Sequence, residues 1–97
     1  MRRRLKMLPV VWLDSAVADL QTIVDFIAGA DPEAARRLAM QFIEDADNLA
    51  VLPAQYRLGR VPGTHEFVSH PNYILVYRRT LDAVEVLNVV HARQQYP

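Results

Sequence analysis

The segment at residues 83–91 constrains the fold most, because both of the faces that it would present as a β-strand are apolar. Alternate side chains of a strand point to opposite faces of its sheet. The apolar side chains fall on one face at Val84, Val86 and Val90, and on the other at Leu87 and Val89. This pattern is typical of a central strand that is covered on each side. We therefore predict that residues 83–91 lie inside a sheet.

Three further segments have the composition of strands. Residues 65–70 and 73–80 are rich in β-branched and aromatic side chains. The tight link at Leu81 and Asp82 predicts a hairpin between the last two strands. Residues 8–13 form a short apolar run with a proline near its start, where a missing N–H is tolerated.

Two helices are predicted between the first strand and the other three. After Asp14, the expected N-cap, apolar side chains recur at three- and four-residue spacing as far as Gly29, the expected stop. Asp31 and Pro32 open a second helix, whose apolar stripe continues to about residue 52. Because so few residues join the two helices, they must run antiparallel as a helical hairpin.

The predicted order of elements is therefore β-α-α-β-β-β. We expect an α+β fold, in which a small and mostly antiparallel sheet carries the N-terminal helical hairpin packed on it. A loop with two prolines and two glycines, residues 53–63, links the hairpin to the sheet. Residues 1–97 form a single domain in this interpretation, with residues 1–6 as a flexible basic extension.

Composition argues against several classes of chemistry. The absence of cysteine excludes disulfides and thiolate catalysis and agrees with a reducing cytoplasm. Eleven basic and eleven acidic residues give no net charge, whereas a domain that grips nucleic acid unaided usually has a basic excess. No apolar run approaches the ~20 residues that span a bilayer. We expect neither a cofactor nor a membrane partner.

Side chains of catalytic type gather around the predicted sheet. The candidates are Arg60, His65, Glu66, His91, Arg93 and Tyr96. Residues of these types can take a proton from a hydroxyl, stabilise negative charge and protonate a leaving oxygen. The structural alternative is that His91 and Arg93 cap the edge of the sheet or pair with Glu66. His65 and His70 would point to opposite faces of a strand, so we expect no metal site.

The order of elements and a series of motifs resemble the RelE/ParE superfamily, the toxins of bacterial type II toxin–antitoxin modules. The matching residues are Pro53, Gly59, Arg60, Gly63, Thr64, Glu66, His70 to Tyr73, Tyr77 and Val89 to Arg93. The chain looks most like the ParE branch, whose members have similar Leu-Pro-Val-x-Trp-Leu openings and His-Ala-Arg-x-x-Pro endings. The resemblance implies a cognate antitoxin that wraps the toxin in a hetero-oligomer.

Two toxic activities are known in the superfamily, and the resemblance implies one of them. RelE-like members cleave mRNA on the ribosome, and ParE-like members poison DNA gyrase. If this chain is a ribonuclease, the six candidates of catalytic type given above would carry out the metal-free cleavage of RNA. RelE-like nucleases that resemble this chain carry arginine where it has Ile74, and the family usually has arginine where it has His65. We therefore predict a toxin that inhibits DNA gyrase by binding, with the ribosome-dependent mRNA endonuclease as the alternative. A third interpretation is a module that has lost toxicity and only binds its antitoxin.

The surfaces that would contact an antitoxin or a target are predicted from exposed polar residues. The expected partner-binding residues are Arg36, Arg37, Gln41, Arg78, Arg93 and Tyr96. The arginine pair on the second predicted helix also has a plain structural reading, since such pairs are more often a solvated helix face. For Arg93 and Tyr96 the corresponding reading is that they close the end of the sheet.

Overall fold

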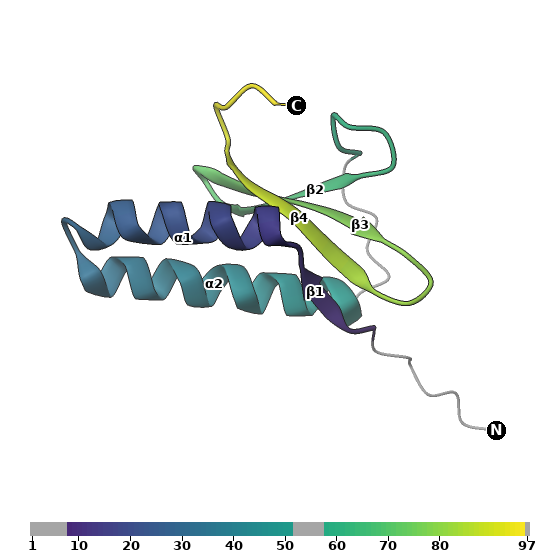
Figure 1. Cartoon of the computed structure of the whole chain (residues 1–97), viewed down its shortest axis with the longest axis horizontal. Coiled ribbons are helices and arrows are strands. Elements are labelled where there is room, and N and C mark those ends of the chain that lie inside the picture. The colour runs from purple at the N-terminus through teal and green to yellow at the C-terminus, as the bar shows by residue number, and fades with distance from the viewer. Residues whose placement is uncertain (1–7, 52–57, 97) are drawn as a thin grey trace.

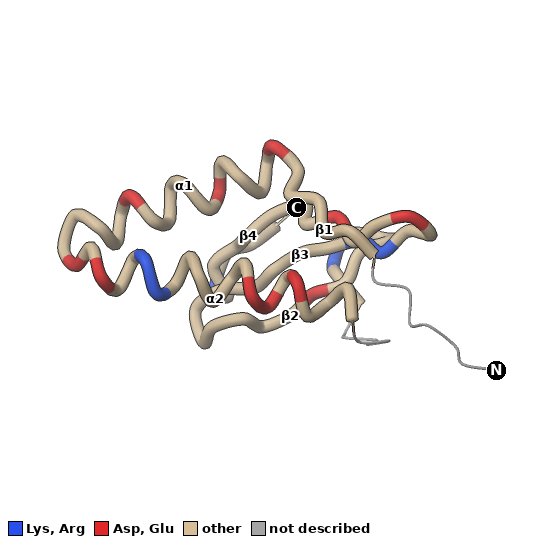
Figure 2. The backbone as a smooth tube through the Cα atoms, turned by 90° about the horizontal axis from the view of Figure 1, so that it is seen from below, with Lys and Arg blue, Asp and Glu red and all other residues tan. Residues whose placement is uncertain are grey.

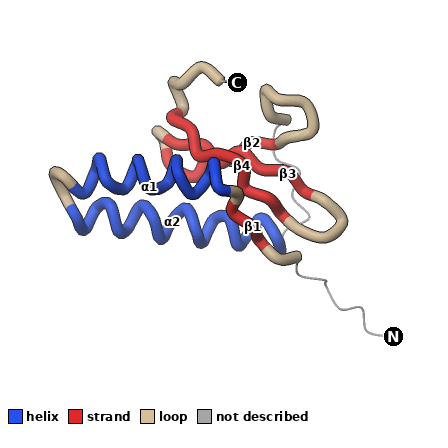
Figure 3. The backbone as a smooth tube through the Cα atoms, viewed as in Figure 1, coloured by secondary structure: helices blue, strands red, loops and turns tan. Residues whose placement is uncertain are grey.

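The computed structural model describes residues 8–51 and 58–96, and within them two helices and four strands follow the predicted order (Figure 1 and Figure 3). The elements are β1 (Val10–Trp12), α1 (Asp14–Ala28), α2 (Pro32–Val51), β2 (His65–His70), β3 (Tyr73–Arg79) and β4 (Val84–His91). The expected basic extension at residues 1–6 and the first part of the expected loop, residues 53–57, lie outside the described residues.

The four strands form one mixed sheet with the order β1-β4-β3-β2. β1 pairs with β4 in parallel, and the other two pairs are antiparallel, which confirms a mostly antiparallel sheet. β4 lies between β1 and β3, so the prediction of an internal strand is confirmed. The helical hairpin packs on one face of this sheet, and its connected end projects past the strands (Figure 1 and Figure 2).

A β-bulge interrupts the pairing of β3 with β4. Val76 is opposite Asn88, but the next residue of β3, Tyr77, is opposite Val86. Leu87 is therefore the extra residue of β4. A bulge of this kind adds one residue to a strand, bends it and increases its local twist.

The bulge makes the predicted division of β4 into two faces wrong beyond Leu87. Val89, and not Val90, joins Val84 and Val86 in the core beneath the helices. Val90 packs on the opposite face, with Leu87 beside it. The physical reason is that one inserted residue reverses the alternation of side chains along the rest of the strand.

Asp19 of α1 binds the polar groups that the bulge turns toward the helix. Its Oδ2 accepts hydrogen bonds from the backbone N–H of Val89 and from Nδ2 of Asn88, both at 3.0 Å. Ser15, one turn earlier, donates its hydroxyl to the carbonyl oxygen of Leu87 at 2.6 Å. Since a buried backbone group without a partner is costly, these bonds both satisfy the bulge and fix α1 on β4.

The predicted apolar stripe of α2 supplies most of the helical side of the core. Its buried side chains are Ala35, Leu38, Phe42, Ala46, Leu49 and Ala50. Phe42 is fully buried and meets the ring of Tyr73 edge-on, with 5.7 Å between centroids. By contrast, α1 buries only Ala16 fully.

The two helices begin differently. Asp31 caps α2 as predicted, because its Oδ1 accepts the N–H of Ala34 at 3.1 Å. The prediction that Asp14 caps α1 is wrong: Leu13 is the N-cap, with no side-chain bond. The N–H of Leu13 instead donates to the carbonyl of Val86 at 3.0 Å, so the β1 pairing continues to the residue before the helix. Asp14 lies in the first turn, where its negative charge still interacts favourably with the positive end of the helix dipole.

No helix within residues 8–51 and 58–96 is both long enough and apolar enough to cross a membrane.

Replacing Asp19 with alanine is expected to lower the free energy of unfolding by about 2 kcal/mol, because the bulge amide loses a charged acceptor. Asp19→Asn keeps one acceptor oxygen and should lose less. Asp25→Ala, an exposed position of the same helix, is the control and should change stability by less than ~0.5 kcal/mol. Urea unfolding measures all three. An Asp19→Ala protein as stable as the Asp25→Ala control contradicts this role.

Candidate functional site

Two glycines shape the loop that places Arg60 beside the sheet. The N–H of Gly59 donates to the carbonyl of Thr64 at 2.8 Å, and a Cβ at Gly59 would lie 2.1 Å from the Thr64 hydroxyl oxygen. Gly63 has φ +83°, a conformation that side chains with a Cβ rarely adopt. The loop therefore closes tightly on itself just before β2.

Arg60, Glu66 and Tyr96 meet on the face of the sheet away from the helices. Glu66 of β2 is only 3% exposed. The Tyr96 hydroxyl donates to Oε2 of Glu66, which also accepts the backbone N–H of Arg60 at 3.3 Å. The Arg60 Nε lies 3.6 Å from the same oxygen. A buried carboxylate is tolerated only with such partners.

The Arg60 side chain also contacts the C-terminal segment, residues 92–96. One guanidinium nitrogen donates to the carbonyl of Gln94 at 3.0 Å, and the guanidinium carbon lies 4.4 Å from the centroid of the Tyr96 ring. That distance is within the range of a cation–π interaction. Tyr96 also packs against the apolar cluster of Ile74, Val76 and Val90.

This environment raises the pKa of Tyr96 to about 12. Burial of the phenol is the largest cause, and the hydrogen bond to Glu66 and the negative charge of that carboxylate act in the same direction. Arg60 acts in the opposite direction. The phenol of Tyr96 is therefore held in its neutral form and is a weaker acid than an ordinary tyrosine.

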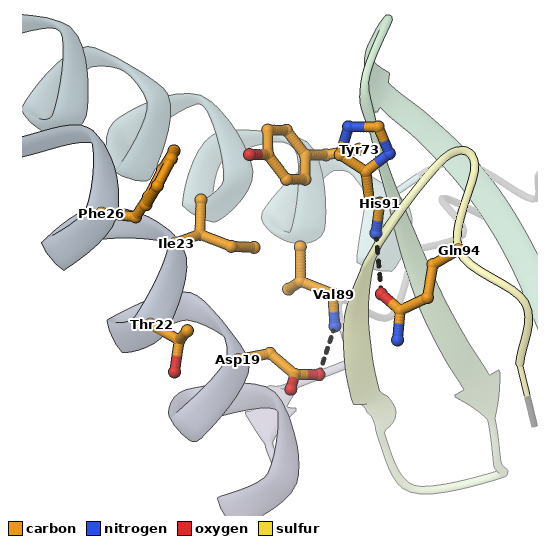
Figure 4. Close-up of a pocket in the computed structure, with 8 residues that line it drawn as sticks. All are labelled: Asp19, Thr22, Ile23, Phe26, Tyr73, Val89, His91 and Gln94. Carbon is orange, nitrogen blue, oxygen red and sulfur yellow. Dashed lines mark hydrogen bonds between the residues drawn. The ribbon is translucent and has the colours of Figure 1, made fainter.

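On the helical side of the sheet, a groove of about 490 Å³ runs between α1 and the end of β4 (Figure 4). It is lined by Asp19, Thr22, Ile23, Phe26, Tyr73, Val89, His91 and Gln94. Phe26 is 82% exposed, a large apolar side chain in contact with water. Its position outside the predicted apolar stripe of α1 is the sequence signal that could have identified this groove.

His91 borders this groove and is fixed by backbone groups. Its Nδ1 accepts the N–H of Arg93 at 3.1 Å, and its ring lies 5.4 Å from the Tyr73 ring, edge-on. Its own backbone N–H donates to Oε1 of Gln94 at 3.3 Å (Figure 4). Arg93 itself is exposed.

A second groove of about 450 Å³ lies on the other side of Tyr73, against α2. Arg37 and Gln41 line it together with His70. The Gln41 amide donates to the carbonyl of Ser69, which ties α2 to the end of β2. Arg36 is exposed and forms an ion pair with Glu33 at 3.5 Å. Figure 2 shows this arginine pair among acidic residues along the two helices.

The structure brings together only half of the side chains predicted for RNA cleavage. Arg60, Glu66 and Tyr96 form one cluster on the second face of the sheet, as described above. His91 lies on the helical face, beside Tyr73. His65 lies at the end of the β2–β3 pair opposite to Tyr73. Its ring is stacked on that of Tyr77, with 5.7 Å between the ring centroids.

The predicted partner-binding residues lie in three separate places. Arg36, Arg37 and Gln41 are on α2, and Arg93 and Tyr96 are in the C-terminal segment. Arg78 is on the β3–β4 ladder, where its guanidinium lies 2.7 Å from a carboxylate oxygen of Glu85. Among the described residues, no three histidine, aspartate or glutamate side chains are arranged to hold a metal ion.

The raised pKa of Tyr96 has a consequence at alkaline pH. The native state holds the phenol proton more tightly than the unfolded chain, so the stabilisation is full below pH 10 and is lost as pH rises toward 12. We expect the absorbance difference between the wild type and Tyr96→Phe to show no phenol ionisation around pH 10 while circular dichroism stays native. A phenol that titrates at its ordinary pKa of 10 contradicts the described environment.

Sequence comparisons place the chain in one family. A family model described as the ParE toxin of the type II toxin-antitoxin system, parDE, matches residues 10–96. The Sinorhizobium fredii protein Y4kP is 40% identical over 87 residues, which cover 89% of this chain and 90% of that protein. Toxin RelE2 of Caulobacter vibrioides is 36% identical over 86 residues, which cover 89% of this chain and 97% of that protein.

Solved structures share the fold. A chain of the chromosomal ParDE TA system from P. aeruginosa has a TM-score of 0.78 at 21% identity, covering 88% of this chain and 96% of that one. A YafQ mutant from E. coli has a TM-score of 0.53 at 17% identity, covering 88% of this chain and 93% of that one. The family match over residues 10–96 and the two relatives show that the chain belongs to the ParE toxin family of type II toxin–antitoxin systems.

Proposed function

We propose that this toxin inhibits DNA gyrase by binding, and that a cognate antitoxin neutralises it in the cytoplasm. The observation that favours binding over turnover is the separation of the RNA-cleavage candidates. Cleavage of a phosphodiester needs its acid, base and charge-stabilising groups within reach of one substrate. Here the sheet lies between His91 on one face and the cluster of Glu66 and Tyr96 on the other.

The environment of Ile74 supports the same proposal. RelE-like nucleases that resemble this chain carry an arginine at this position. Ile74 is 2% exposed and packs with Val76 and Val90 in the second apolar cluster. A buried apolar side chain there cannot stabilise the negative charge of a phosphorane. The formal net charge of zero also gives little attraction to ribosomal RNA.

Ribosome-dependent mRNA cleavage is the second candidate function. Arg60 and Tyr96 lie together on the second face, with the guanidinium over the ring, and residues of these types can bind RNA. The relative from Caulobacter vibrioides is named Toxin RelE2.

The C-terminal segment is the proposed contact with the target. The N–H of Arg93 is bonded to His91, while Arg93 is exposed. The chain there is fixed, and the cation is presented to solvent. The exposed side chains of α2, Arg36, Arg37 and Gln41, together with Arg78, remain predicted contacts for the antitoxin or the target.

The groove beside α1 is the proposed site for an apolar segment of the antitoxin. Phe26, Ile23 and Val89 line this groove between α1 and β4 (Figure 4). Exposed apolar patches of this kind mark interaction sites, and amphipathic helices commonly fill such grooves. Burial of Phe26 by a partner would remove one of the largest exposed apolar side chains from water.

Replacing Arg93 with alanine is expected to leave folding unchanged, because the side chain lies beyond β4 and is exposed. Growth arrest on induction should weaken, since the proposed contact loses its cation. Arg93→Lys keeps the charge and should be intermediate. Growth curves measure the arrest, and circular dichroism checks the fold. Full arrest by a folded Arg93→Ala protein would contradict the proposal that Arg93 contacts the target.

Truncation of Phe26 to alanine should weaken antitoxin binding at least ~10-fold, as for a buried aromatic anchor at an interface. Leu81→Ala is the matched control, because Leu81 is 91% exposed and lies in the β3–β4 turn. Titration calorimetry with purified antitoxin gives both dissociation constants. Equal constants for the two variants would place the antitoxin elsewhere.

Induction of the toxin in cells separates the two activities. Gyrase poisoning should produce DNA breaks, an SOS response and filamentous cells with intact transcripts. Codon-phased transcript cleavage without DNA damage would instead favour the endonuclease. DNA damage reporters and transcript end mapping from one culture provide both readouts.

A further inference from the structure

The C-terminal segment is fixed at its beginning by backbone bonds. After β4 the N–H of Ala92 donates to the carbonyl of Asn72 at 2.7 Å, and the N–H of Gln94 donates to the carbonyl of His91 at 2.8 Å. These bonds define a turn just before and around Arg93. A single turn held by so few backbone bonds opens locally unless the residues beyond it are also held.

The other end of the segment is fixed by side chains from a distant part of the chain. The Tyr96 hydroxyl bonds to Glu66 of β2, although the segment leaves the sheet from β4. Since β3 lies between β4 and β2, the segment must cross the face of β3 to reach this partner. The Tyr96 ring covers the apolar side chains of Ile74 and Val76 on the way.

Arg60 connects both halves of this arrangement. It contacts Glu66 through its backbone N–H and its Nε, and it contacts the segment at Gln94 and at the Tyr96 ring. The exposed Arg93 directly precedes Gln94 in the sequence. Arg60, Glu66 and Tyr96 therefore each contact the other two.

We infer that Arg60, Glu66 and Tyr96 form a latch that fixes residues 92–95 in the conformation in which the toxin engages its target. Tyr96 is then a positioning residue, which acts by orienting Arg93 and its neighbours rather than by contact of its own. The inference rests on the proposed function of the C-terminal segment as the target contact. The raised pKa of Tyr96 agrees with it, because a phenol that donates a hydrogen bond to a carboxylate loses its proton less readily.

The first test measures the order of the segment in the full-length toxin. Tyr96→Phe keeps the ring but removes the hydroxyl, and should speed hydrogen exchange at the Gln94 amide roughly 10- to 100-fold, as for a lost hydrogen bond to a charged group. Glu66→Gln keeps the shape of the side chain, and its amide oxygen can still accept a hydrogen bond from the phenol. The effect of this variant on exchange should therefore be smaller. Tyr77→Phe removes a hydroxyl from the helical side of the same sheet and should leave this exchange unchanged.

The second test asks whether the latch acts through Arg93. Growth arrest is compared for Tyr96→Phe, Arg93→Ala and the double variant. A latch that orients Arg93 predicts that Tyr96→Phe weakens arrest in the wild-type background and has much less effect once Arg93 is alanine. Additive losses, or full arrest by a Tyr96→Phe toxin whose segment exchanges faster, would overturn the inference.

Two further outcomes are decisive as well. A segment that stays protected in both Tyr96→Phe and Glu66→Gln would refute the latch itself. If the wild-type toxin arrests growth without inhibiting gyrase, the proposed target is wrong. The latch is still tested in that case, because amide exchange and growth arrest do not depend on which target is bound.

Discussion

The structure depends on the burial of β4 on both of its faces. β4 pairs with β1 and β3, carries core side chains under the helices and carries others under the C-terminal segment. The bulge at Leu87 changes which side chains of β4 face the helices partway along the strand. Asp19 of α1 accepts hydrogen bonds from the bulged part of β4, and these bonds attach the helical hairpin to the sheet.

The two faces of the sheet consequently carry different features. The helical face has the apolar groove around Phe26, and the second face has the latch of Arg60, Glu66 and Tyr96. Residues that resemble a ribonuclease set in the sequence are divided between these faces. We therefore propose two binding surfaces, one for an antitoxin and one for a target, in place of one catalytic centre.

The sequence was sufficient to predict the order of elements, the hairpin of helices and the internal position of β4. Strong periodicity, the Asp31 cap and the tight β3–β4 turn each have a local cause that can be read from neighbouring residues. The same local evidence located the candidates around Glu66 and Tyr96, and the resemblance gave the family.

The errors arose where distant parts of the chain decide the local structure. Asp14 has the character of a cap, yet the pairing of Leu13 with Val86 moves the start of α1. The bulge in β4 has no marker in the strand itself, since Asp19 that satisfies it lies about seventy residues away. Glu66 and Tyr96 were both candidates, but their bond across β3 required the topology.

The most direct test is a gyrase supercoiling assay run beside a ribosome-dependent mRNA cleavage assay on one preparation of the toxin. A toxin that acts by contact should inhibit supercoiling in proportion to its occupancy of gyrase and leave mRNA on ribosomes intact. Addition of antitoxin should reverse the inhibition. Multiple-turnover cleavage of mRNA with normal supercoiling would contradict this account.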